Sequence, residues 1–237
     1  MELRAACAYT APNGPYHTEG NLIFDRQNRP YLIRGTKLSP LVLDESAKKG
    51  SLVEFRPLSA TTLITIRQRL NMNAVRIPVS VAQYEAGSAY KLRLEEFVRL
   101  ANRLELLVII EASEPFYETQ PGDSNLFWAD LAARFRDNPD VFFAPLSARR
   151  VRSIRQTGAL QLLIIDGPET ALLGERNIIY EVTPHYAALK TDAGRRKQFD
   201  DARGAPLLVN GLDPELTSVQ KVVRRFPVIP LTPLFWF

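Results

Sequence analysis

Segments with a helical hydrophobic period alternate with segments that have a strand pattern. Apolar residues recur at helical spacing over 59–71, and the β-branched centre of 73–79 predicts a short strand directly afterwards. The same order returns downstream, where 91–105 has a helical apolar stripe and 106–113 is a continuous apolar run. Such a run is typical of a strand that is covered on both faces. The chain is therefore expected to contain successive α–β units.

The rest of the chain continues this order. Helices are expected over 125–137, 188–203 and 214–226, and further strands over 31–38, 141–148, 160–167, 177–184, 206–211 and within 227–237. Near the start, apolar residues flank the turn-forming run 25–28, so 20–35 is expected to form two short strands around that turn.

Helical connections between most of these strands imply that the strands are parallel. Up to eight such units favour an α/β fold of the (β/α)8 TIM barrel type over a doubly wound sheet, whose glycine-rich phosphate loop is absent here. A length of 237 residues fits one compact domain spanning 1–237. No helix is expected after the last strand. Without that helix, the outer face of the barrel beside the last strand is exposed. This exposure predicts lower stability or a homodimer, unless a partner or the N-terminal segment covers that face.

Composition removes several classes of function. The net charge is +4, and the basic runs at 148–155 and 194–199 lack interleaved aromatic residues, so we expect solvated helix faces and no nucleic-acid partner. One cysteine, Cys7, excludes an internal disulfide, and no cluster has metal-ligand spacing. No cofactor is expected. The chain also lacks an apolar run of about 18 residues, so we expect no membrane span.

The predicted elements resemble those of glycoside hydrolase family 5, the cellulase-like group of barrel enzymes. "GNLIFDRQNRPYLIRGTKLS" is similar to the opening hairpin and first strand of that family, and "LNMNAVRIPV" to its second strand. The other similar segments are "LELLVIIEASE", "FWADLAARFRDNPDV", "LLIIDGPE", "NIIYEVTPHY" and "APLLVNG". Their order and spacing extend over almost the whole chain. The resemblance implies a TIM barrel whose partner is an oligosaccharide or polysaccharide.

The residues at the catalytic positions depart from the family pattern. Retaining glycosidases use two carboxyl groups roughly 5–5.5 Å apart, one as acid and base and one as nucleophile. The Asn-Glu-Pro motif of the family falls on residues 147–149, which puts Ala148 at the acid position. The nucleophile position falls near Asn210 and Gly211, and Ser113 replaces the third-strand histidine. The resemblance thus implies a barrel without its catalytic glutamates.

Other residues remain as candidates for binding a sugar. Arg76 matches the arginine that the family holds near its nucleophile, and it is expected either to stabilise the barrel or to contact a ligand. His185 and Tyr186 resemble a His-x-Tyr sugar site, with a surface loop pair as the alternative. Glu111 follows the third strand, and Trp236 could stack on a sugar beside the eighth.

Relocated catalysis is the competing hypothesis. Barrel active sites form at the carboxyl ends of the strands, where Glu114, Asp166 and Asp213 are expected. These three carboxylates could form a new acid and nucleophile pair, although Asp213 also has the position of a helix cap.

Three functions are therefore open. The leading one is a family 5-like barrel that binds carbohydrate or acts as a scaffold without catalysis. The second is an active glycosidase with relocated carboxylates, and the third is a structural or partner-binding barrel without sugar affinity. The start of the chain has no secretory leader, which favours a cytoplasmic protein or a mature form, whereas the resemblance favours an extracellular or periplasmic one.

Overall fold

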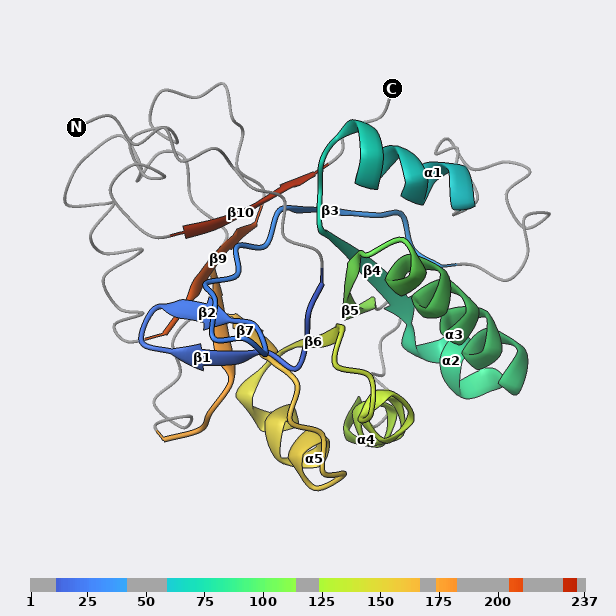
Figure 1. Ribbon diagram of the computed structural model, residues 1–237. Helices are drawn as coiled ribbons and strands as arrows, with labels where there is room; N and C mark the ends of the chain where they lie inside the picture. The colour runs from blue at the N-terminus through green and yellow to red at the C-terminus, as the bar shows by residue number, and fades with distance from the viewer. Residues whose placement is uncertain are drawn as a thin grey trace, which may run out of the picture.

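The computed structural model describes residues 12–41, 59–113, 124–166, 174–182, 205–210 and 228–233. Within them, parallel strands close into a barrel in the order β10-β3-β4-β5-β6-β7-β8-β9 (Figure 1). These strands are β3 (Gly35–Lys37), β4 (Ala74–Ser80), β5 (Leu107–Ser113), β6 (Val141–Leu146), β7 (Leu163–Asp166), β8 (Ile178–Val182), β9 (Leu207–Asn210) and β10 (Val228–Pro233). The expected parallel sheet, including a strand within the final segment, is confirmed.

Helices lie outside the strands from β3 to β7 (Figure 1). They are α1 (Ala60–Ile64), the π-helical turn η2 (Thr65–Arg69), α2 (Val81–Ala86), α3 (Ser88–Arg103), α4 (Ser124–Phe135), the 3-10 turn η3 (Ala148–Arg150) and α5 (Val151–Arg155). The expected helices over 188–203 and 214–226 lie outside the described residues, as does the chain end after β10. A complete alternation of eight strands with eight helices is therefore not established. No described helix has the length and apolarity needed to span a membrane.

The short helix α2 was not expected from the sequence. Its first turn is capped by Ser80, whose side chain accepts a hydrogen bond from the backbone N–H of Gln83. Tyr84 on this helix is buried and donates its hydroxyl to Asp130 of α4 at 2.6 Å. One cap and one tertiary hydrogen bond thus stabilise this helix. A helix of six residues is too short for its hydrophobic pattern to predict it.

In β4 and β5, alternate residues enter two different hydrophobic clusters. Val75 and Ile110 pack with the helices in the outer cluster, which also contains the buried Trp128 of α4. Ala74 and Ile109 belong to the second cluster, inside the barrel. This period of two residues decides which side chains point into the barrel. The expectation that Trp128 is a core residue is confirmed.

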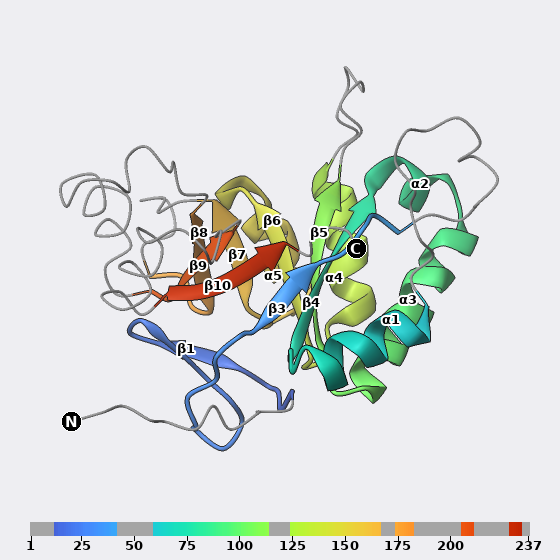
Figure 2. The ribbon, with the colours of Figure 1, turned by 90° about the horizontal axis from the view of Figure 1, so that it is seen from above.

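An N-terminal hairpin covers the end of the barrel where the strands begin. The strands β1 (His17–Glu19) and β2 (Leu22–Phe24) pair antiparallel at one end of the barrel (Figure 2). Tyr16, Ile23 and Tyr31 are buried in the inner cluster, together with residues near the starts of the barrel strands. The hairpin therefore closes the amino end of the barrel interior.

A turn at 25–28 was expected between two strands, and this turn is confirmed, but the strand after it is reduced to a single bridge between Phe24 and Pro30. The paired strands are β1 and β2, between which the chain reverses at Gly20 and Asn21, so 25–28 is the second turn of this segment. Proline has no backbone N–H, so the second strand of the expected pair has one fewer donor for a ladder. Gly20 has φ +55°, a conformation that suits glycine at a tight turn.

Asp25 holds this second turn together. One of its carboxylate oxygens accepts the backbone N–H groups of Gln27 and Arg29, at 2.9 and 3.0 Å, and the other accepts two N–H groups of the Arg29 guanidinium, at 2.9 and 2.8 Å. Burial acts to raise the pKa of Asp25, but the hydrogen bonds from Arg29 and Gln27 outweigh it and lower this pKa. A lowered pKa means that the native state favours the carboxylate.

Asp25→Ala is expected to reduce the free energy of unfolding by about 2–3 kcal/mol, because it leaves two backbone donors without their acceptor. Glu19→Ala, which removes an exposed carboxylate from β1, should change it by less than about 0.5 kcal/mol. Urea denaturation of both variants at neutral pH checks this. Because the folded-state pKa of Asp25 is lowered, the difference between wild type and Asp25→Ala should shrink as pH falls below about 4. A difference that is independent of pH would contradict this role of the carboxylate.

Candidate functional site

A layer of charged side chains lies inside the barrel toward the carboxyl ends of its strands. Two residues after the inward-facing Ala74 comes Arg76, and two after Ile109 comes Glu111. Glu181 follows the inward-facing Ile179 in the same way. The strand period therefore turns all three side chains into the barrel. The interior is apolar near the hairpin and charged beyond it.

Arg76 connects the two carboxylates of this layer. Its Nε donates to Oε2 of Glu111 at 2.8 Å, and its Nη1 donates to Oε2 of Glu181 at 2.7 Å. The Arg76 side chain is fully buried, and those of Glu111 and Glu181 are 12% and 5% exposed. Ion pairs this deeply buried must offset the free energy of removing each charge from water. The three residues therefore depend on one another.

Lys37 completes the pairing at the more solvent-accessible side. Its Nζ lies 2.9 Å from Oε2 and 3.1 Å from Oε1 of Glu111. The side chain is 39% exposed, so this end of the layer is in contact with water. Two cations and two carboxylates balance in charge, and Glu111 is shared by both cations.

One nitrogen of the Arg76 guanidinium has no hydrogen-bond partner among the described residues. This nitrogen is Nη2, which is buried. A guanidinium carries two N–H donors on this nitrogen. A buried charged donor without an acceptor is unfavourable, so this position calls for an oxygen atom from a water molecule or a ligand.

Asp166 lies beside this layer at the end of β7. It is paired in register with Glu181 on β8, and it follows the inward-facing Ile164 by two residues. Neighbouring strands lie about 4.8 Å apart, so the two carboxylates start from adjacent positions on the same face. Asp166 is exposed, in contrast to Glu181.

The position expected for the catalytic acid is part of a tight turn. Leu146 ends β6 with φ +58°, and the Ser147 side chain accepts a hydrogen bond from the backbone N–H of Arg149 at 3.4 Å. Ala148 begins η3 directly after this cap. Ser147 accordingly acts here as a local cap, and the methyl group of Ala148 brings no proton donor.

The structure brings together two of the predicted site residues, Arg76 and Glu111, and places Asp166 nearby. The candidate set drawn from the sequence does not include Lys37 or Glu181. The available signal was that Lys37 lies near the end of the predicted strand 31–38 and that Glu181 is a carboxylate on the predicted strand 177–184. The other predicted site residues lie outside the described part of the chain: Glu114, His185, Tyr186, Asp213 and Trp236. No group of histidine, cysteine or acidic residues in the described part is arranged to hold a metal ion.

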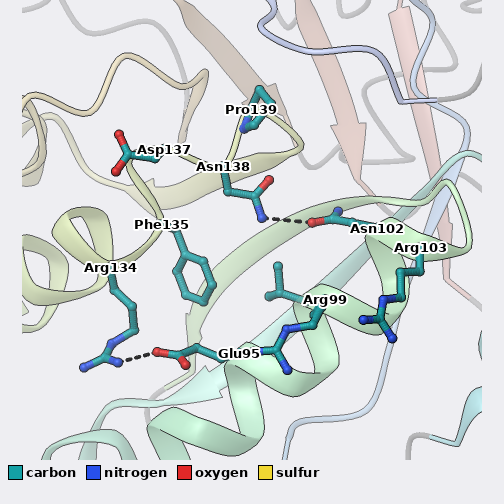
Figure 3. Close-up of a pocket in the computed structure, with 10 residues that line it drawn as sticks. Glu95, Arg99, Asn102, Arg103, Arg134, Phe135, Asp137, Asn138 and Pro139 are labelled. Atoms are coloured by element: carbon teal, nitrogen blue, oxygen red, sulfur yellow. Dashed lines mark hydrogen bonds and ion pairs between the residues drawn. The ribbon is translucent and has the colours of Figure 1, made fainter.

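A groove of about 640 Å³ lies elsewhere, between α3 and the turn that follows α4 (Figure 3). Two contacts cross it: the ion pair of Arg134 with Glu95, and a hydrogen bond from Asn138 to Asn102 at 2.9 Å. The mostly buried ring of Phe135 lies between them. These contacts join the two helices just before β6 begins. The groove is thus on the helical flank, away from the charged layer inside the barrel.

No protein-family model and no curated protein sequence matches this chain. Solved structures do resemble it. A β-glucanase from Saccharophagus degradans, solved in complex with cellotetraose, superposes with a TM-score of 0.68 at 13% identity, covering 100% of this chain and 91% of that one. The chain has a glycoside hydrolase family 5-like fold.

Two more structures of this type support the same fold. A mannanase catalytic domain from Streptomyces sp. SirexAA-E has a TM-score of 0.64 at 14% identity, covering 100% of this chain and 85% of that one. A halotolerant family 5 cellulase from an Icelandic hot spring isolate has a TM-score of 0.62 at 10% identity, covering 94% and 83%. Structural similarity at such low sequence identity establishes the fold of this chain and leaves its activity open.

Arg76→Met is expected to reduce the free energy of unfolding by about 3–5 kcal/mol, because it leaves two buried carboxylates without their shared cation. Adding Glu111→Gln and Glu181→Gln to that variant should restore part of the loss, since no uncompensated buried charge remains. Arg93→Met, which removes the exposed pair with Glu96 on α3, should cost less than about 1 kcal/mol. Urea unfolding of the three variants measures these changes. Equal losses for Arg76→Met and Arg93→Met would disprove that the two buried carboxylates depend on Arg76.

Proposed function

We propose that this protein is a (β/α)8 barrel of the glycoside hydrolase family 5 type that binds an oligosaccharide at the carboxyl end of its barrel and does not hydrolyse it. One observation carries the proposal. Glu111 and Glu181, the carboxylates described inside the barrel, are both bound to the guanidinium of Arg76. Both carboxylates neutralise a buried cation, and this role supports a binding site in which they do not act as a hydrolytic pair.

The sequence at the expected catalytic positions agrees with this proposal. Ala148 stands at the acid position, after a strand end capped by Ser147. Asn210 ends β9, the strand that carries the nucleophile in the family pattern. An alanine and an amide can perform neither of the two carboxyl functions. The absence of a carboxyl group at both the expected acid position and the expected nucleophile position supports a barrel that does not hydrolyse glycosides.

The place of the charged layer supports carbohydrate binding. Ligands of barrel proteins bind at the carboxyl ends of the strands, where Lys37 and Asp166 are exposed to water. The Nη2 group of Arg76 is a donor without a described acceptor, and sugar hydroxyl groups are acceptors. Binding of cellotetraose by the similar β-glucanase is in line with a ligand of this class.

The proposal predicts binding without turnover. Titration calorimetry of the wild type should show a Kd of about 1 mM or tighter for cellotetraose or mannotetraose. A reducing-sugar assay on β-glucan and mannan should detect no hydrolysis. Lys37→Met should weaken binding about three- to tenfold, because it removes an exposed donor at the site. Lys91→Met, which removes a lysine paired with Asp130 on the helical flank, is the matched control. No binding of either tetramer would overturn the proposal, as would turnover.

A second function, an active glycosidase with relocated carboxylates, is favoured by the register of Asp166 and Glu181. Side chains on adjacent strands in register start about 4.8 Å apart, which is close to the spacing of a retaining pair. This candidate predicts hydrolysis by the wild type and a loss of about 100-fold or more in both Asp166→Asn and Glu181→Gln. Activity that survives both substitutions would rule out this pair. The other proposed members of such a pair, Glu114 and Asp213, lie outside the described residues.

A further inference from the structure

The groove between α3 and the turn after α4 carries more positive than negative charge. Its lining includes three arginines and two carboxylates: Arg99, Arg103, Arg134, Glu95 and Asp137. Both carboxylates are engaged, because Glu95 pairs with Arg134 across the groove and Asp137 pairs with the arginine before it in the chain. Asp137 also points away from α3 (Figure 3). Arg99 and Arg103 remain as the charged side chains of this lining that have no ion pair within the described part of the chain.

Arg99 and Arg103 differ in this respect from the other basic residues of α3. Lys91 pairs with a carboxylate of α4, and Arg93 pairs with a carboxylate on α3 itself. Arg103 stands in the last turn of α3, where a cation also stabilises the helix dipole, but Arg99 lies one turn earlier. Two like charges four residues apart repel each other on a helix. An anionic group from a binding partner would relieve this repulsion.

The base of the groove is partly apolar. Val98 and Phe135 line it and are buried, and the hydrogen bond from Asn138 to Asn102 crosses it. The groove has a volume of about 640 Å³, which is in the range of sites that hold a drug-sized ligand and is much larger than one small ion. A matching ligand therefore carries two anionic groups on a framework that also covers an apolar base.

We propose that this groove binds an extended acidic peptide of a partner protein, in which two carboxylates at alternate positions pair with Arg99 and Arg103. Residues i and i+2 of an extended chain lie on the same side, about 6.6–6.8 Å apart. Side chains four residues apart on a helix start about 5–6 Å apart, so the two spacings agree. A continuous polyanion such as a nucleic acid is disfavoured, because Glu95 and Asp137 line the same groove.

Two peptides of equal composition test this proposal. In acetyl-LEAEL-amide the carboxylates stand at alternate positions, whereas in acetyl-LEEAL-amide they are adjacent and point to opposite sides of an extended chain. NMR titration of the isotope-labelled protein at low salt should give a Kd of about 1 mM for the first peptide, with shift changes in α3 and the turn after α4. The second should bind about threefold more weakly. In about 1 M salt, where the screening length is about 3 Å, binding of both should be lost.

Substitutions of the two arginines distinguish this site from a general charge effect. Arg99→Gln and Arg103→Gln should each weaken binding of acetyl-LEAEL-amide about threefold, and the double variant about tenfold. The double variant should also bind the two peptides equally. Arg152→Gln removes the same charge from an exposed side chain of α5 that does not line the groove, and it should keep the wild-type affinity. All of these side chains are exposed, so the variants are expected to fold.

Four results would each overturn the proposal. They are no binding of acetyl-LEAEL-amide, equal affinity of the wild type for the two peptides, an unchanged affinity in the double variant, and inorganic phosphate binding to the same arginines as tightly as the peptide. The proposal does not rest on carbohydrate binding, because the groove lies on the helical flank of the barrel. The double variant should accordingly bind sugar tetramers as the wild type does.

Discussion

The charge on Arg76 is the constraint around which the barrel interior is arranged. A fully buried guanidinium is unfavourable unless negative groups surround it, and Glu111 and Glu181 supply these from strands on different sides of the barrel. Arg76 is on β4, so its pair with Glu111 joins neighbouring strands, whereas its pair with Glu181 on β8 reaches across the barrel interior. A substitution of this arginine therefore removes the ion-pair partner of a carboxylate on β5 and of one on β8.

The similarity to glucanases and mannanases at 10–14% identity follows from how such a barrel is specified. Strand residues alternate between an outer cluster against the helices and an inner cluster, and many combinations of aliphatic residues satisfy both. Chemistry depends on a few positions at the strand ends, which can change without loss of the packing. The shared architecture therefore leaves the chemistry at the strand ends of this chain open.

Much of the fold was predictable because it is written in periodic patterns. The continuous apolar run of β5 and the helical stripe of α3 both reflect burial that is repeated over many residues. The helix α2 was missed because it depends on the cap of Ser80 and one tertiary hydrogen bond from Tyr84, and the pairing of β1 with β2 was missed because each of these strands has only three residues. In the site, the burial of Arg76 and its partners came from long-range geometry. Nothing local to Glu181 states that it would face a residue 105 positions away.

The N-terminal hairpin limits the access of solutes to the barrel interior. Its aromatic side chains, with Tyr16 and Tyr31 only 4.7 Å apart between ring centroids and Tyr16 edge-on to Phe142, fill the interior where the strands begin. Among the described residues, this packing blocks the amino end of the barrel interior, so the charged layer meets water on the side of Lys37. Substitutions in the aromatic cluster are therefore expected to change the stability of the barrel without altering the side on which the charged layer meets water.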